Sequence, residues 1–428
     1  MVPEVLRQTP FRRFWSARTI SLFGDQVAMV AAPLVAALVL DAGPAEMGYL
    51  VAAGMLPHLL LSVYAGAWVD RRGRRRQTMI AADLGRAVLV LTVPAAAVLG
   101  VLTMSQLYVV GFAMGVLSVF FDVSHSTLFV SLVSRDDYVP ANSLIHGSRA
   151  MSMLGGPTLG GILVEIITAP LTLIANSVSF LASAFLLGRI NPVEPPTETR
   201  TSGHISAGAR YIWRTPVVRA ALGATATVNF FMYMIMALYV LYTTTALEMR
   251  PGALGLTIGA GAIGGVLGAI VTGKVAKRIG VGPAFAVGCV AFPAPWLILP
   301  ALGGPGWHAV VLLAVANIGS GVGLMVLDIS VGSIFAAIIP HRLRARVDGA
   351  YRTVNFGIKS LGALAGGGLA TVYGMRPALW VAGLGAITSV LWVLGSPIPG
   401  MRTLPERSKD LDEESEYAVP ESTTGGDK

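Results

Sequence analysis

The chain has 428 residues, of which 54% are hydrophobic and only 13% are charged, and its formal net charge is +8. Soluble domains carry charge on roughly a quarter of their residues, so this composition excludes an ordinary soluble domain and indicates many membrane spans. The single cysteine, Cys289, excludes a disulfide framework. The amino terminus shows no cleavable signal, so we expect the first span to remain in the mature protein.

Apolar stretches long enough to cross a bilayer recur about twelve times along the chain, with short polar breaks between them. Membrane helices tolerate the 50 glycines and 25 prolines where neighbouring helices satisfy the backbone. We therefore predict an all-α membrane protein. Its spans are expected near residues 14–40, 45–67, 77–100, 106–133, 141–168, 170–190, 217–243, 252–275, 282–303, 308–336, 346–372 and 375–396.

A proline-rich break after the sixth span divides the chain into six spans and six spans. It carries Pro192, Pro195 and Pro196, and its later part predicts an amphipathic surface helix near residues 205–213. The end of the chain is polar and acidic, which is typical of a disordered tail. The predicted segments are an N-terminal half over 1–190, a cytoplasmic linker over 191–216, a C-terminal half over 217–399 and a disordered tail over 400–428.

Positive charge is distributed unevenly along the chain. Nearly all of the 31 lysine and arginine residues fall in the amino-terminal arm, in alternate loops or in the tail, and only Arg250 and Arg376 fall on the other face. This bias predicts that both termini are cytoplasmic in a multi-pass protein of the cell (inner or plasma) membrane. We interpret the basic runs as topology anchors that touch anionic lipid, and we expect no nucleic-acid partner.

The loop after the second predicted span, residues 66–76, reads GAWVDRRGRRR, and a diverged copy, GKVAKRIG, lies at residues 273–280. The same offset takes Gly155 to Gly362 and Gly160 to Gly367. The loop resembles the signature between the second and third spans of the major facilitator superfamily, and the resemblance covers nearly the whole chain. It implies twelve transmembrane helices in two pseudo-symmetric six-helix halves, with the substrate bound between them.

The resemblance also implies a gating role for this loop. Its candidate residues are Gly66, Asp70, Arg71, Gly73 and Arg74. In the family the aspartate interacts with the start of the eleventh helix, where an anion gains about 0.3–1 kcal/mol from the helix dipole. The alternative is a solvated carboxylate among topology arginines. The second copy carries a lysine at the aspartate position, so the two loops cannot be equivalent.

Span 5 contains Gly156, Pro157, Gly160 and Gly161, which resemble a motif of drug:proton antiporters in this superfamily. The match is partial, because Ser143 and Ser152 stand where that motif has earlier glycines. The pattern favours export, and the first span, the linker and span 5 together resemble the subgroup of macrolide and siderophore exporters. The alternative is ordinary close packing in a glycine-rich helix.

The ionisable residues within predicted spans include Asp25, Asp122, Asp328 and Lys359. Charges inside a bilayer are costly and usually mark a transport pathway. We predict that Asp25 and Asp122 carry protons and that Lys359 stabilises a deprotonated partner. The alternatives are a structural ion pair, for example between Lys359 and Asp328, or a lysine that binds an anionic substrate. The span-4 arginine of the antiporters is missing, which leaves the relay undefined.

Aromatic and methionine side chains adapt to varied apolar ligands and therefore suggest the wall of a substrate cavity. The alternative for each is lipid contact or core packing. The candidates are Phe120, Phe121, Phe230, Phe231, Tyr233 and Met234.

The sequence as a whole predicts a monomeric secondary active transporter that exports amphipathic small molecules by proton antiport. The proton gradient would supply the energy, and we expect no cofactor, no metal site and no enzymatic activity, because no catalytic constellation is visible. The alternatives are an importer or uniporter of the same fold, or a nontransporting membrane sensor or scaffold.

Overall fold

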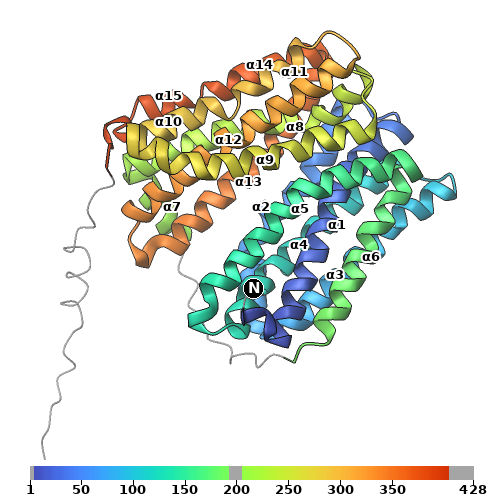
Figure 1. Cartoon of the computed structure of the whole chain (residues 1–428), viewed down its shortest axis with the longest axis horizontal. Coiled ribbons are helices and arrows are strands. Elements are labelled where there is room, and N and C mark those ends of the chain that lie inside the picture. The colour runs from blue at the N-terminus through green and yellow to red at the C-terminus, as the bar shows by residue number, and fades with distance from the viewer. Residues whose placement is uncertain (1–3, 192–204, 404–428) are drawn as a thin grey trace, which may run out of the picture.

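The structure, a computed structural model, describes residues 4–191 and 205–403, and within these ranges it contains helices and no strand (Figure 1). The amino-terminal elements are η1 (Glu4–Arg7), α1 (Thr9–Val39), α2 (Pro44–Arg72), α3 (Arg75–Val98), α4 (Met104–Leu132), η2 (Arg135–Asp137), α5 (Tyr138–Ile167) and α6 (Ala169–Gly188). The others are α7 (Ile205–Arg214), α8 (Pro216–Thr245), α9 (Pro251–Ile279), α10 (Val281–Ala291), η3 (Ala294–Leu297), α11 (Ile298–Ala301), α12 (Trp307–Ile338), α13 (His341–Tyr373), α14 (Met375–Ile387), α15 (Val390–Leu394) and η4 (Ile398–Gly400).

The predicted spans agree closely with these helices. Ten helices in the described part of the chain are long and apolar enough to cross a membrane by length and composition. The two remaining predicted spans coincide with α2 and α13, which have 29 and 33 residues. At about 1.5 Å per residue, each is longer than a bilayer core of about 30 Å. The ninth and twelfth predicted spans are interrupted, since short helices replace one continuous helix in each.

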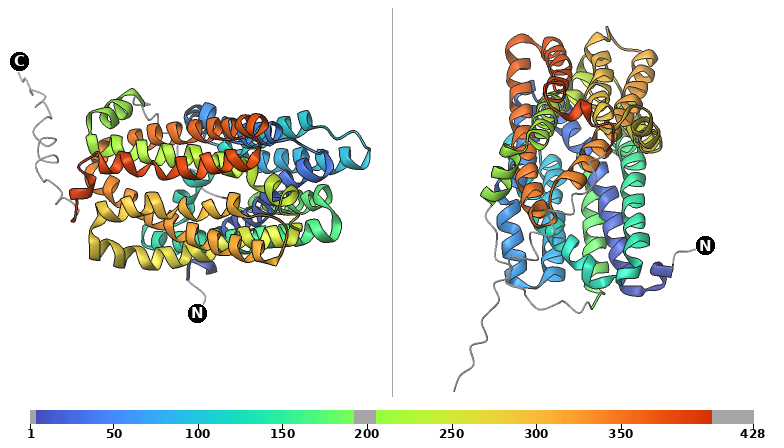
Figure 2. Two further views of the ribbon diagram at one scale, coloured as in Figure 1. Left: turned by 90° about the horizontal axis from the view of Figure 1, so that it is seen from above. Right: turned by 90° about the vertical axis from the view of Figure 1, so that its left-hand side faces the viewer.

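Helices α1 to α6 and helices α8 to α15 form two bundles that lie side by side (Figures 1 and 2). The bundles meet mainly through α2 against α13 and α5 against α9, with further contacts of α1 and α2 to α8. Helix α7, which falls in the predicted linker and confirms the predicted surface helix, packs against α13. Residues 192–204 of the linker and 404–428 of the tail lie outside the described residues, so the predicted tail disorder stays a prediction.

The two halves contact each other most closely at one end. We call the end that carries η1, the α2–α3 loop and α7 the basic face, and the end that carries residues 40–43, 246–250 and 302–306 the opposite face. Close contacts between α2 and α13 run from Gly48, beside Gly367 near the opposite face, to His58. Figure 1 shows the halves diverging from there toward the basic face.

Candidate functional site

The candidate site is built from charged side chains within the membrane spans of the two halves. Asp25 is half-buried in the middle of α1. The preceding residue, Gly24, packs so closely on Asn176 and Ser179 of α6 that an added Cβ would overlap both side chains, and this contact fixes the rotation of α1. Within the described residues, the Asp25 carboxylate has no hydrogen-bond or ion-pair partner. Arg18 and Arg86 lie near enough to act on it electrostatically.

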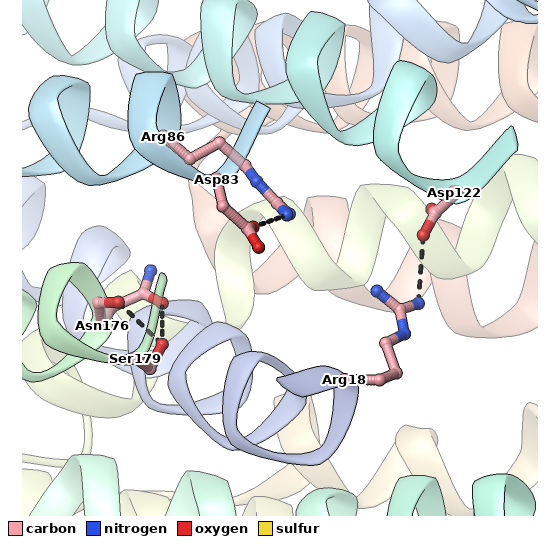
Figure 3. Close-up of polar contacts among 6 residues, drawn as sticks. All are labelled: Arg18, Asp83, Arg86, Asp122, Asn176 and Ser179. Carbon is pink, nitrogen blue, oxygen red and sulfur yellow. Dashed lines mark hydrogen bonds and ion pairs between the residues drawn. The ribbon is translucent and has the colours of Figure 1, made fainter. Parts of the chain in front are cut away.

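Arg18 of α1 and Asp122 of α4 form an ion pair with 3.0 Å between guanidinium nitrogen and carboxylate oxygen (Figure 3). The Asp122 side chain is 52% exposed and that of Arg18 20%, so the pair lies at a surface inside a span. The Arg18 guanidinium also lies 5.3 Å from the ring centroid of Phe121. Sequence reasoning did not single out Arg18, although its position nine residues into α1 marks it as an intramembrane charge.

Behind this pair lies a second one, Asp83 with Arg86 on α3, joined by a hydrogen bond and fully buried (Figure 3). The Arg86 guanidinium is also 4.4 Å from the ring centroids of Phe121 in α4 and Phe180 in α6. Phe121 is therefore packed inside the amino-terminal half and is 0% exposed. Its ring fills the space between two arginines in this state, and its predicted place in the wall of a substrate cavity stays a prediction.

The carboxy-terminal half contributes Lys359 of α13, whose ammonium lies 5.2 Å from the Tyr233 ring centroid and 5.1 Å from that of Phe356. Phe356 stacks on His58 of α2 with 4.9 Å between ring centroids, so this cation–aromatic cluster connects the two halves. Sequence reasoning did not single out His58, a polar residue in a largely apolar span. Asp328 of α12 acts electrostatically on Lys359, but within the described residues the two form no ion pair.

The remaining cavity candidates have different surroundings. Phe230 and Phe231 of α8 make an edge-to-face contact at 5.1 Å, and the Phe231 ring packs where Gly385 of α14 leaves room. Met234 is only 3% exposed and packs on Gly366 of α13 in this state, and its predicted place in a cavity wall stays a prediction. Phe120 packs on Trp68 of α2 with 5.2 Å between ring centroids.

The glycines of span 5 bring three helices together. An added Cβ at Gly156 would overlap Gln26 of α1, and one at Gly160 would lie 2.9 Å from the Val27 carbonyl oxygen of the same helix. Gly161 faces the other way, toward Gly255 and the Pro251 carbonyl of α9 in the second half. These glycines allow close helix approach and bring α5 against α1 of its own half and α9 of the second half, while the role of the motif in export stays a prediction.

The predicted gating loop connects α2 to α3 on the basic face. Gly73 ends α2 in the left-handed conformation, with φ of 62° and its N–H donating to the Val69 carbonyl at 3.1 Å, and Arg74 precedes α3. Gly66 has open space where a side chain would extend. Arg71 is exposed. The side chain of Asp70 lies outside the described residues, so its gating role stays a prediction.

The two halves are also linked on the opposite face. Oε2 of Glu165, at the end of α5, accepts a hydrogen bond of 3.1 Å from the N–H of Gly252 in the first turn of α9. Oε1 of Glu165 lies 3.9 Å from a guanidinium nitrogen of Arg250. Sequence reasoning did not find this link, because nothing in the sequence shows that residue 165 meets residue 252.

The sequence matches the family described as transmembrane secretion effector over residues 3–423. It is 30% identical over 180 residues to the multidrug efflux pump Tap of Mycolicibacterium fortuitum, an alignment covering 39% of this chain and 43% of Tap. It is 25% identical over 381 residues to the uncharacterized MFS-type transporter YfiS of Bacillus subtilis (strain 168), which covers 86% of this chain and 88% of YfiS.

Solved structures share the fold. A bacterial homologue of the iron transporter ferroportin in an inward-facing state matches with a TM-score of 0.73 and 16% identity, over 92% of this chain and 99% of that one. A mutant of the nucleoside transporter NupG matches with a TM-score of 0.71 and 11% identity, over 91% of this chain and 99% of that one. At these identities the likeness shows the fold alone. Because the family match covers nearly its whole length, the chain belongs to the transmembrane secretion effectors, a family of major facilitator superfamily transporters.

Proposed function

We propose that this transporter exports amphipathic small molecules from the cytoplasm by proton antiport and acts as a monomer in the cell (inner or plasma) membrane. The observation that carries the proposal is Asp25, an intramembrane carboxylate without a partner among the described residues. The family description as a secretion effector and the partial similarity to a multidrug efflux pump support the direction.

In the proposed cycle the basic face is cytoplasmic, as its arginines favour. The halves diverge toward that face (Figure 1), which supports entry of a cytoplasmic substrate from this side in this state. Alternating access then requires the contacts of α2 with α13 and of α5 with α9 near the opposite face to open while the basic face closes.

Proton coupling follows from competition at Asp25. An intramembrane carboxylate is tolerated when it is protonated or balanced by a nearby cation. Arg18 and Arg86 supply nearby positive charge, while Asp122 is already paired with Arg18. We therefore assign the exchanged proton first to Asp25, with Asp122 taking part when its pair with Arg18 opens.

The aromatic cluster around Lys359 suggests the chemistry of the substrate. Tyr233, Phe356 and His58 offer aromatic surface, and Lys359 supplies a cation beside two of these rings. Such a wall suits a ligand with a flat apolar body and one polar or anionic group.

The test is substrate-driven proton movement in proteoliposomes, after a screen of drug, siderophore and metabolite panels has identified a transported compound. Asp25→Asn is expected to reduce proton movement by about tenfold or more, because an amide cannot exchange a proton, and Asp25→Glu should retain most of it. Asp136→Asn, in the exposed short helix η2, is the matched control and should behave as wild type. Coupling that survives Asp25→Asn combined with Asp122→Asn would contradict the proposal. Substrate flux without proton movement in the wild-type protein would favour a uniporter.

A further inference from the structure

A groove near the basic face lies outside the facing surfaces of the halves. Helices α2 and α3 both pack on α4 and contact each other little, so α4 forms the floor between them. The groove has a volume of about 450 Å³, within the range of about 300–1,000 Å³ typical of small-molecule sites. Its lining includes Trp68 and Arg72 of α2, Arg74 before α3, Ala81 of α3, and Leu117 and Phe120 of α4.

The lining changes from charged to apolar with depth. Arg72 and Arg74 stand at the mouth, at the turn between α2 and α3. The Arg72 guanidinium lies 4.9 Å from the Trp68 ring centroid, and that ring packs edge-to-face on Phe120. Stacked rings of this kind hold one geometry and present an apolar surface below the two cations.

The α3 wall of the groove belongs to the bilayer-facing side of that helix. Ala81 lies in the groove, and Leu84, Val88 and Leu91 follow it along the same helical stripe and are 45%, 63% and 38% exposed. Large apolar side chains on the outside of a membrane bundle contact lipid. Because α3 packs against α4 and α6 of its own half, this stripe faces away from the carboxy-terminal half. The groove therefore continues a lipid-contacting surface.

We propose that this groove binds one anionic phospholipid from the leaflet at the basic face. The headgroup phosphate lies between Arg72 and Arg74, and an acyl chain covers Trp68, Phe120 and Leu117. Arginine suits phosphate because its planar group donates several hydrogen bonds. A free phosphate ion would use the two arginines and leave the apolar floor uncovered, whereas a lipid satisfies both parts. The bound lipid would join α2 to α3 where only the short loop around Gly73 connects them.

The test uses the full chain in vesicles of phosphatidylcholine and phosphatidylethanolamine, with Trp68 as the remaining tryptophan and the others replaced by phenylalanine. Phosphatidylglycerol brominated on its acyl chains is the quencher, and brominated phosphatidylcholine is the reference. Half-maximal quenching is expected at a mole fraction of brominated phosphatidylglycerol at least about fivefold below that of brominated phosphatidylcholine. Each surface arginine strengthens binding of anionic lipid by about that factor.

Arg72→Gln with Arg74→Gln should remove this preference. Arg12→Gln with Arg71→Gln is the matched control, because it removes two exposed charges from the same face without touching the groove. If the single-tryptophan protein does not fold, native mass spectrometry of the chain with all its tryptophans gives the same comparison through retained phosphatidylglycerol.

Three results would overturn the proposal. Equal quenching by the two lipids would show no headgroup recognition. Equal loss of preference in the control pair would show a diffuse surface charge effect. Displacement of the brominated lipid by millimolar inorganic phosphate would show a site for the soluble ion.

Discussion

At the scale of single residues, the two ion pairs of the amino-terminal half differ in burial and therefore in what their loss should cost. Asp83 and Arg86 have side chains only 0% and 2% exposed, so removing one charge leaves the other unpaired in a low-dielectric interior. We expect Arg86→Met to lower the free energy of unfolding by about 3–5 kcal/mol. SDS titration in mixed micelles measures this.

The control for that prediction is the more exposed pair. Arg18→Met should cost no more than about 1 kcal/mol, because solvent screens a partly exposed charge. Asp83→Asn combined with Arg86→Met should be less damaging than Arg86→Met alone, since no unpaired charge remains. A double variant less stable than the single variant would show that the pair has a different role from mutual neutralisation.

At the scale of helices, the crossing of α5 and α9 depends on glycine at two facing positions. A Cβ at Gly161 would overlap the Pro251 carbonyl, and one at Gly255 would overlap the Pro157 carbonyl. Gly161→Ala should therefore destabilise this state by about 1–3 kcal/mol through overpacking and favour opening at the opposite face. Spin labels at exposed positions 166 and 256, in a Cys289→Ser background, should report a longer distance.

Gly147→Ala is the control on the same helix, because nothing lies within 4 Å of its added Cβ. It should leave the distance unchanged, and its helix propensity can only favour α5. An unchanged distance in Gly161→Ala would mean that α5 and α9 do not separate during the cycle.

The contacts of Glu165 with α9 should also favour the state that is closed at the opposite face, by a smaller amount. Its carboxylate accepts from Gly252 at a helix start but is 42% exposed, so its contribution is about 1 kcal/mol or less. Glu165→Ala is expected to shift the population about fivefold toward opening at the opposite face, measured with the same spin labels.

Glu46→Ala is the matched control, because Glu46 accepts a 2.7 Å hydrogen bond from Gly43 at the start of α2 within its own half. It removes a helix cap of the same chemistry and should leave the balance between the halves unaltered. A shift of equal size in both variants would assign the Glu165 effect to general helix stability.

At the scale of the whole molecule, the two halves meet at one face and diverge toward the other, so orientation decides the direction of access. We expect a membrane-impermeant maleimide to label Gly303→Cys from outside intact cells and Arg71→Cys only in inverted vesicles, both in a Cys289→Ser background. Both positions are exposed, so accessibility within the protein does not decide the result. The reverse labelling pattern would contradict the cytoplasmic assignment of the basic face.

Helix positions could be predicted from the sequence because hydropathy and length act locally. A stretch of about 20 apolar residues in a bilayer must satisfy the hydrogen bonds of its own backbone N–H and C=O groups, and a helix does so without any distant partner. The helix at Ile205–Arg214 could be predicted for the same reason. The resemblance of the loop at residues 66–76 to the superfamily signature added the prediction of two six-helix halves. The family match and the shared fold support this prediction.

Only the tertiary structure decided which side chains meet. Arg18 pairs with Asp122 and Glu165 meets Gly252 across long stretches of chain, and no local pattern encodes either contact. Phe121 and Met234 suited a cavity wall by residue type, but both side chains are buried between packed helices in this state. The physical reason is that an apolar composition is enough to make a stretch form a membrane helix. The rotation of that helix depends instead on where a neighbouring helix can approach closely, as at Gly24 and Gly161.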